Sequence, residues 1–368
     1  MRDGGPIVFM GAGAVGGYVG GMLSANGDDI VVIDAWPSHI EAIRANGLRL
    51  DTPEGMIQAR PRALHVCDVH ELAGMPVRLA FLCVKLYDTN WAATLLGDTV
   101  RDAPIVTMQN ALVEDDVARI VGTSRTIGAI AGTLDVALVA PGLIRRSRRR
   151  GAKKPVFKVG ELNAEKTPRL NAISALLAKV DTTAMTSHLR DERWAKLVAN
   201  TMTTGLSGVS GLTFLEVYRR DDTRRIAIKL AAEALAVGHQ LGFRLAPVFG
   251  VLPERWQAAN AGEPEALAEV MSAMEAQRGS MVEGGISGTL QDLSKGRRTE
   301  VDYFNGYVAE QGRACGVSAA THAALARLIR RMEAGEFSPS AARLTELIQI
   351  VMPEDSACGA SPLSVSGQ

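Results

Sequence analysis

The sequence has few cysteines, and none of them is arranged to hold a metal ion. Only four occur in 368 residues, and they include no Cys-x-x-Cys pair and no cysteine with histidines at metal-ligand spacing: Cys67, Cys83, Cys315 and Cys358. Such usage is typical of reduced thiols rather than of a secreted disulfide scaffold. We therefore expect a cytoplasmic protein without a metal site.

A net charge and a long hydrophobic run are also missing. Forty basic and forty acidic side chains cancel, so no overall field favours nucleic acid or an anionic membrane as a partner. No apolar run reaches the roughly 18 residues of a membrane span, and the first predicted strand begins too early for a signal peptide to precede it. Walker and nucleophile-elbow motifs are absent as well.

One dense basic run, from Arg145 to Lys154, departs from this even charge pattern. Runs of this kind can bind nucleic acid. This one lies between two predicted strands and has no aromatic residue on which a base could stack. We therefore interpret it as a solvated hairpin, with steering of an acidic substrate or cofactor as a lesser alternative.

A glycine-rich turn near the N-terminus is the strongest functional signal. The strand-like run Ile7 to Met10 is followed by a G-x-G-x-x-G pattern and a helix with an apolar face. These glycines permit a tight turn, close approach of the backbone to a pyrophosphate and close packing of the helix, whose N-terminus offers N–H groups to the anion. A tight β–α turn without a ligand is the alternative. The predicted cofactor-binding residues of the loop are Gly11, Gly13, Ala14, Val15 and Gly16.

An acidic residue, Asp34, ends the second predicted strand, Ile30 to Ile33. It lies about twenty residues beyond the glycine loop, where a carboxylate accepts hydrogen bonds from the adenosine ribose. A 2′-phosphate there would meet like charge without an adjacent arginine, so NAD(H) is favoured and NADP(H) is the alternative. Asp34 could instead cap the helix predicted from Ser38 to Asn46, although Ser38 could do so equally well.

Strand and helix patterns alternate through the first half of the chain, and helical periods prevail from Arg190 onward. We predict an α/β Rossmann-type dinucleotide-binding domain over residues 1–188 and an all-α domain over 189–340, followed by a final helix and a disordered tail over 341–368. The further strands are predicted at 48–50, 56–59, 77–84, 105–108, 126–134, 136–144 and 156–159. The further helices are predicted at 88–96, 168–179, 191–202, 223–241, 264–277, 319–332 and 341–351, with another that ends at Cys315.

Polar residues stand where such a fold presents groups to ligands. Lys85 and Asn110 follow predicted strands, and the C-terminal ends of parallel strands line the ligand crevice. Lys85 could contact the cofactor or be a solvated strand-end lysine. Lys196 and Asn200 are four residues apart and share one face of a predicted helix, where a lysine is otherwise an ordinary surface residue.

Four segments follow one another in the chain: the glycine loop, Gln109-Asn110, the segment from Trp194 to Asn200, and the segment Thr299-Glu300-Val301-Asp302. In this order they resemble the ketopantoate reductase family, and the match runs from about residue 6 to 334. The resemblance implies an N-terminal Rossmann domain, a helical second domain and a cleft between them for the nicotinamide and a small 2-keto acid. The implied reaction is hydride transfer from NAD(P)H to the ketone of ketopantoate, which gives pantoate for pantothenate synthesis.

The resemblance also implies the roles of individual residues. Lys196 corresponds to the family's general acid, and Glu300 to a substrate-binding glutamate, although it could simply be a carboxylate at a helix start. A positioned ammonium suits this reaction, because charge develops on the ketone oxygen as hydride arrives. Lys85 and Asn110 correspond to cofactor-contacting residues. The expected substrate contacts are Asn110, Asn200, Thr204 and Ser287.

The chain departs from the family pattern at several positions. Gly288, flanked by Ser287 and Thr289, stands in place of a serine that holds the substrate carboxylate, and Thr204 replaces an asparagine. Asp34 replaces an arginine of NADP-using members, and there is extra sequence at 247–284. The alternatives are a related dehydrogenase for another 2-keto or hydroxy acid and a dinucleotide-binding sensor without turnover. Apolar helices of the second half could pair in a homodimer, but the same stripes are needed for the domain's own core.

Overall fold

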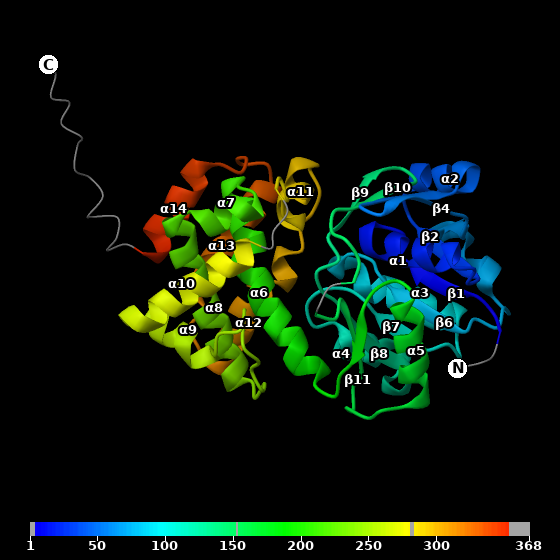
Figure 1. Ribbon diagram of the computed structural model, residues 1–368, viewed down its shortest axis with the longest axis horizontal. Helices are drawn as coiled ribbons and strands as arrows, with labels where there is room; N and C mark the ends of the chain where they lie inside the picture. The colour runs from blue at the N-terminus through cyan, green and yellow to red at the C-terminus, as the bar shows by residue number, and fades with distance from the viewer. Residues whose placement is uncertain (1–3, 152–153, 280–282, 353–368) are drawn as a thin grey trace, which may run out of the picture. The chain divides into compact units, whose positions relative to one another are not determined.

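The computed structural model describes residues 4–151, 154–279 and 283–352. Contacts divide the chain into two units, Met1–Arg193 and Trp194–Gln368. The division falls within helix α6 (Leu189–Ser210), a few residues after the predicted boundary. The predicted disordered tail, 353–368, lies outside the described residues. Figure 1 shows an α/β first unit and a helical second unit, so the predicted fold class is confirmed.

The first unit is built on an eight-stranded sheet with the order β12-β11-β8-β7-β6-β1-β2-β5. The six strands from β8 to β5 in this order are parallel, whereas β11 runs antiparallel to β8. The strands are β1 (Ile7–Met10), β2 (Ile30–Asp34), β5 (Arg62–His65), β6 (Leu79–Leu82), β7 (Ile105–Thr107), β8 (Thr126–Ala131), β11 (Phe157–Glu161) and β12 (Thr183–Met185).

Helices cover both faces of this sheet, because apolar residues alternate between two cores. Along β1, Ile7 and Phe9 belong to one core cluster, and Val8 and Met10 to the other. The helices α1 (Ala14–Ala25), α2 (Pro37–Asn46) and α5 (Pro168–Ala178) contribute to the first cluster. The second cluster receives α3 (Thr89–Thr99) and α4 (Glu114–Val121). The described residues also form short 3₁₀ helices, which are η1 (Val66–Leu72), η2 (Leu86–Asp88), η3 (Thr123–Arg125) and, in the second unit, η4 (Val301–Tyr303).

A second, four-stranded sheet has the order β4-β3-β10-β9. Its strands are β3 (Leu48–Thr52), β4 (Gly55–Ala59), β9 (Val136–Ala140) and β10 (Leu143–Arg146). The prediction of one strand over 136–144 is wrong. Gly142 adopts a φ of +69° and turns the chain, so that β9 and β10 pair as an antiparallel hairpin.

Helix α1 packs between the two sheets, and glycines on opposite sides of the helix allow both approaches. A Cβ added at Gly20 would lie 3.1 Å from Cδ2 of Phe9 in the large sheet. One added at Gly21 would lie 3.0 Å from Cδ2 of Leu48 in the small sheet. The paired glycines of α1 therefore set how closely both sheets approach the helix.

The basic run is not a solvated hairpin, because β10 and β11 belong to different sheets. Arg145 and Arg148 lie at the surface, but Arg146 is fully buried in an ion pair with Asp181. Nη1 of Arg146 also donates a hydrogen bond to the hydroxyl of Tyr18, 2.9 Å away. The sequence pattern did not indicate this burial, since nothing local separates Arg146 from its neighbours.

The environment of Asp181 explains why the buried pair is charged. Burial by itself raises the pKa of this carboxyl, but a hydrogen bond from Arg146 and backbone N–H bonds from Gly151 and Thr182 bring the pKa below its ordinary value. The pair anchors the connection between the two sheets to the start of β12.

The second unit is a bundle around α8 (Asp221–Gln240), which contacts most of the other helices of the unit. Three helices of this unit were not predicted from the sequence, which are α7 (Phe214–Arg219), α9 (Pro253–Asn260) and α11 (Gly288–Ser294). The extra sequence at 247–284 forms α9 and the predicted α10 (Pro264–Arg278), which pack together against α8 and bury Trp256. The remaining helices are α12 (Asn305–Cys315), α13 (Ala320–Glu333) and α14 (Ala341–Val351).

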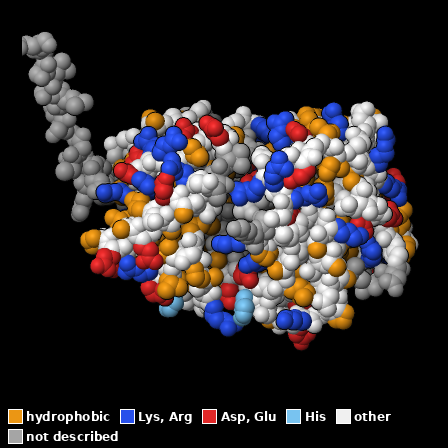
Figure 2. Space-filling view, in the orientation of Figure 1, with side chains coloured by type: hydrophobic (Ala, Val, Ile, Leu, Met, Phe, Trp, Pro, Cys, Tyr) orange, Lys and Arg blue, Asp and Glu red, His pale blue; other side chains and the backbone are white. Residues whose placement is uncertain are grey.

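The surface carries both signs of charge. Figure 2 shows basic and acidic side chains interspersed over its visible face. Ion pairs account for part of this mixing; Arg145, for example, lies 2.8 Å from Asp51. No helix in the described part of the chain combines the length and the apolar character needed to span a bilayer.

We predict that Asp181→Asn lowers the free energy of unfolding by about 3–5 kcal/mol, because the Arg146 charge stays buried without its counter-charge. Urea unfolding followed by circular dichroism measures this loss. Asp135→Asn is the matched control, because it removes the partner of the partly exposed Arg148 and should cost less than about 1 kcal/mol. Equal losses in the two variants would contradict a special role for the buried pair.

Candidate functional site

The glycine loop between β1 and α1 leaves no room for side chains at two positions. Gly11 has a φ of +98°, and a Cβ there would lie 2.7 Å from the carbonyl carbon of Cys83. A Cβ at Gly16 would lie 2.1 Å from the carbonyl oxygen of Gly11. These two glycines are therefore required by the turn and by the contact of α1 with the chain that follows β6.

The third glycine of the motif has a different environment. Nothing lies within 4 Å of a Cβ added at Gly13, so the protein's own packing does not require glycine there. Helix α1 begins directly after Gly13 with no side-chain cap, and no acidic residue occurs in its first turn, which includes Ala14 and Val15. Open space beside uncapped N–H groups fits the close approach of a dinucleotide pyrophosphate.

Asp34 connects this loop to the start of α2. Its Oδ2 accepts a hydrogen bond from the N–H of Ala12, and its Oδ1 accepts one from the N–H of Trp36, both at 2.9 Å. The helix-cap alternative is wrong, because α2 begins at Pro37 and has no side-chain cap. Each carboxylate oxygen can accept two hydrogen bonds, so Asp34 retains acceptor capacity for ribose hydroxyls.

The other predicted cofactor residues follow neighbouring strands of the same sheet. Gly11 follows β1, Asp34 ends β2, and Lys85 and Asn110 follow β6 and β7. These four strands are adjacent and parallel in the order β7-β6-β1-β2. The structure therefore brings the four residues to one edge of the sheet, with Asp34, Lys85 and Asn110 half-buried.

The loop that presents Asn110 is held from inside the fold. Nε2 of Gln109 donates to the carbonyl oxygen of Val84, at 3.1 Å, and to Oγ1 of Thr89, at 2.8 Å, and so joins the ends of β6 and β7. The next residue, Ala111, has a φ of +57°, which is uncommon for a residue other than glycine. The position of Asn110 is thus strongly constrained by its neighbours.

A second support of this loop, which was not predicted from the sequence, is the fully buried side chain of Arg193. Its guanidinium forms an ion pair with Glu114 and donates to the carbonyl oxygen of Gln109. It also donates to the carbonyl oxygens of Thr107 and Ala129, at 3.2 and 3.1 Å. No sequence signal distinguishes Arg193 from the surface arginines, because its partners are more than sixty residues distant along the chain.

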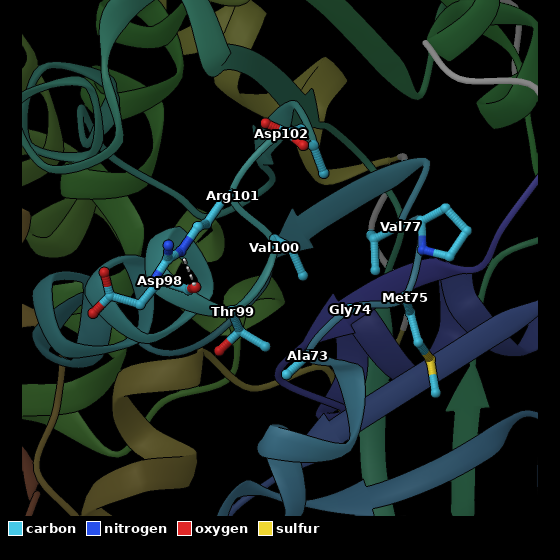
Figure 3. Close-up of a pocket in the computed structure, with 11 residues that line it drawn as sticks. Ala73, Gly74, Met75, Val77, Asp98, Thr99, Val100, Arg101 and Asp102 are labelled. Atoms are coloured by element: carbon cyan, nitrogen blue, oxygen red, sulfur yellow. Dashed lines mark hydrogen bonds between the residues drawn. The ribbon is translucent and has the colours of Figure 1, made fainter.

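A cavity of about 460 Å³ in the first unit lies elsewhere. Figure 3 shows it lined by segments 73–77 and 98–103, which precede β6 and β7. It therefore opens at the N-terminal ends of the strands, whereas the glycine loop and Asp34 lie at their C-terminal ends. Ligands of open α/β sheets bind at the C-terminal ends, so this cavity is not the candidate cofactor site.

In the second unit, α6 carries the predicted catalytic and substrate-binding residues on one face. Lys196, Asn200 and Thr204 follow one another at intervals of four residues and are all half-buried. Oγ1 of Thr204 donates to the carbonyl oxygen of Asn200 at 2.8 Å. The neighbouring Trp194 is fully buried and donates its indole N–H to the carbonyl oxygen of Ala234, which ties α6 to α8.

The segment around Ser287 meets the same helix. Ser287 is fully buried as the N-cap of α11, where its hydroxyl accepts a hydrogen bond from the N–H of Leu290 at 3.0 Å and donates to the carbonyl oxygen of Thr204 at 3.1 Å. Both bonds belong to the fold, so a substrate contact by Ser287 stays a prediction. Gly288 is exposed, and a Cβ added there would have no neighbour within 4 Å.

Glu300 is half-buried at the N-terminus of η4, without a side-chain cap to that turn. Five residues later, Asn305 connects this segment to α6. Its Nδ2 donates to the carbonyl oxygen of Thr201 at 3.2 Å and lies 3.1 Å from Nδ1 of His322, whose Nε2 lies 2.9 Å from the carbonyl oxygen of Leu230. Asn305 therefore holds the chain after Glu300 against the helix that carries Lys196.

Family models match both units of the chain. Residues 7–160 match the family model described as ketopantoate reductase PanE/ApbA, and residues 188–333 match ketopantoate reductase PanE/ApbA C terminal. A curated 2-dehydropantoate 2-reductase of Mesorhizobium japonicum is 29% identical over 354 residues, which cover 89% of this chain and 97% of the relative.

Solved structures share the fold of this chain. A PanE/ApbA family ketopantoate reductase from Ralstonia eutropha has a TM-score of 0.72 and 26% identity, and the match covers 90% of this chain and 99% of that one. A D-mandelate dehydrogenase solved with NADH and anilino(oxo)acetate has a TM-score of 0.73 with the same coverage, but 19% identity, so it shows a shared fold.

Fold, site and comparisons together define an NAD(P)-dependent oxidoreductase that acts on a CH–OH group. The chain belongs to the ketopantoate reductase family. The resemblance seen in the sequence is therefore confirmed, whereas the roles of the individual site residues stay predictions.

We predict that the free energy of unfolding depends on pH through the buried imidazole of His322. Burial lowers the pKa of His322 from 6.5 to about 4. Between these pH values the unfolded chain binds more protons than the folded chain, so the free energy of unfolding should fall as the pH falls from 6.5 to 4. The slope from this residue is at most about 1.4 kcal/mol per pH unit.

The measurement is the difference between the urea stabilities of the wild type and His322→Gln across this pH range. Taking the difference removes the contribution of other groups, including the half-buried Glu233, which accepts a hydrogen bond from the N–H of His322. The wild type should lose more stability on acidification than the variant does. Parallel curves would show that His322 is not the titrating group.

Proposed function

We propose that this protein is a 2-dehydropantoate 2-reductase, which reduces the ketone of ketopantoate to give pantoate for pantothenate biosynthesis, with NADH as the reductant. The observation that carries the proposal is the half-buried polar face of α6, formed by Lys196, Asn200 and Thr204, in a chain whose family and curated relatives bear that activity. When bound, the reduced nicotinamide supplies a hydride to the keto carbon.

Lys196 acts as the general acid in this proposal. Its ammonium group donates a hydrogen bond to the keto oxygen, meets the negative charge that develops there and transfers a proton to it. Glu300 accepts a hydrogen bond from a substrate hydroxyl or orients Lys196, and Asn110 and Asn200 provide neutral polar contacts.

We favour NADH over NADPH because of Asp34. The carboxylate holds the N–H groups of Ala12 and Trp36 and keeps acceptor capacity for ribose hydroxyls. A 2′-phosphate in the same place would be repelled by its charge. The proposed contacts to the rest of the cofactor are the N–H groups of the glycine loop and the side chains of Lys85 and Asn110.

A second candidate is a related dehydrogenase for a bulkier 2-keto acid. Gly288 stands where the family's serine would hold the substrate carboxylate, and the space beside it is open. A larger substrate group could use that space. A panel of 2-keto acids with side chains of increasing size, assayed by NADH consumption, separates this candidate from ketopantoate reduction, and no turnover with any of them would favour a sensor.

A cytoplasmic location and a homodimer complete the proposal. Exposed apolar side chains on the second unit, such as Leu252 and Ile350, offer surface that a second copy could cover. Sedimentation analysis measures the oligomeric state directly.

We predict that Lys196→Ala lowers kcat for the preferred 2-keto acid at least a hundredfold, about the contribution of one general acid, with little change in the Kd for NADH. Stopped-flow turnover and fluorescence titration measure the two constants. Lys166→Ala, which removes an exposed lysine of the first unit, is the control and should keep wild-type turnover. Unchanged kcat in Lys196→Ala would remove this lysine from the mechanism.

We predict that Asp34→Asn raises the ratio of kcat/KM for NADPH to that for NADH by about tenfold, because it removes the repulsion of the 2′-phosphate. The ratio is the useful measure, since the lost hydrogen bond to the loop affects both cofactors alike. Glu41→Gln removes an exposed carboxylate from α2 and should leave the ratio unchanged. A wild type that already prefers NADPH would refute the argument from Asp34.

A further inference from the structure

The peptide groups around Ala12, the residue between the first two glycines of the motif, are held on two sides. The N–H of Ala12 donates to Oδ2 of Asp34, and the carbonyl oxygen of Ala12 lies 2.9 Å from Nε2 of His39. His39 belongs to α2 and is fully buried. Both bonds come from side chains far along the sequence, so the conformation of the loop depends on tertiary contacts.

The second ring nitrogen of His39 determines which nitrogen carries the proton. The backbone N–H of Gly142 lies 2.9 Å from Nδ1 of His39, and a backbone N–H can only donate. Nδ1 must therefore accept, so the proton of the neutral ring is on Nε2, from which it is donated to the carbonyl oxygen of Ala12. Gly142 is itself fixed, because its carbonyl oxygen accepts from the N–H of Arg49 on β3.

The direction of this hydrogen bond has a consequence for the next residue. In a trans peptide the carbonyl and the following N–H point in opposite directions. A carbonyl of Ala12 directed at His39 therefore directs the N–H of Gly13 away from α2. Glycine at position 13 would tolerate the opposite orientation of this peptide, which would present a carbonyl oxygen to the ligand instead.

We propose that His39 is a positioning residue for the cofactor loop, because its hydrogen bond to Ala12 keeps the N–H of Gly13 directed outward to the pyrophosphate of the dinucleotide. The inference rests on the dinucleotide site of the proposed function and not on the identity of the 2-keto acid. It also gives the small sheet a role, since the turn between β9 and β10 supplies the N–H that orients the imidazole.

The neighbours of His39 connect the same contact to the adenosine side of the site. The indole ring of Trp36 stacks on the imidazole, with ring centroids 5.8 Å apart and planes inclined by 19°. The backbone N–H of Trp36 donates to Asp34. The start of α2 therefore orders the pyrophosphate loop through His39 and the ribose acceptor through Trp36.

Two substitutions separate this role from ordinary core packing. Asparagine at position 39 can still accept from Gly142 near the place of Nδ1, but it is too short to reach the carbonyl of Ala12. Glutamine can reach both groups. The matched stability control is Ile43→Ala, which removes buried volume from the same helix, because the isoleucine side chain has no polar atom that could hydrogen-bond to the loop.

The experiment measures the Kd values of NADH, ADP-ribose and adenosine by calorimetry, at a temperature where each variant is folded. His39→Asn should weaken NADH and ADP-ribose by about tenfold, the effect of one lost hydrogen bond. It should weaken adenosine much less, because adenosine has no pyrophosphate and the bond from the N–H of Trp36 to Asp34 is retained. His39→Gln should recover most of the affinity, to within about threefold of the wild type. Ile43→Ala should lower the melting temperature while keeping all three Kd values.

The outcomes distinguish this inference from the proposed function. Equal NADH affinity in the wild type and His39→Asn would overturn the inference and leave the dinucleotide site intact. Equal losses for adenosine and ADP-ribose would also overturn it, since they would show general damage to the fold. A wild type that binds neither NADH nor ADP-ribose would overturn the dinucleotide site and the inference together.

Discussion

The close contact between the glycine loop and the end of β6 is the constraint on which the first unit depends. At Gly16 a side chain would overlap the carbonyl oxygen of Gly11, and at Gly11 it would overlap the backbone at Cys83. Only glycine at both positions lets α1 start so close to the sheet. The same helix then separates the two sheets, with Gly20 facing one and Gly21 the other. One helix thus determines the architecture of the unit and the location of its candidate cofactor site.

Buried polar contacts fix the segments that this packing brings together. The ion pair of Arg146 with Asp181 anchors the connection between the sheets. The ion pair of Arg193 with Glu114 supports the loop of Asn110. In the second unit, a hydrogen bond of Asn305 connects the segment after Glu300 to α6. Removing charged groups from water costs free energy, which the attraction between the charges and their hydrogen bonds only roughly offsets. Such buried pairs therefore contribute little net stability. Their directional bonds specify instead which segments meet and in which orientation.

The fold class and most elements could be predicted because they follow from local patterns. The strand at Ile7, the glycine turn and the helix ending at Val351 each have a period or a breaker residue in the chain itself. The strand predicted over 136–144 failed because the turn at Gly142 was not recognised within an apolar run. The short helices α7, α9 and α11 were missed because fewer than nine residues carry too little periodicity to stand out.

The sequence alone determined the class of site: a glycine loop, an acidic residue after the second strand, and a lysine and an asparagine one helical turn apart. These are short-range features, in which residues a few positions apart form one turn or one face. Only the tertiary structure decided that Arg146 and Arg193 are buried, that Ser287 caps a helix, and that His39 holds the carbonyl of Ala12. Each of those contacts needs a partner residue from another segment of the chain. The order of the strands and the packing of the helices determine which residue that is, so no pattern near the residue itself can predict it.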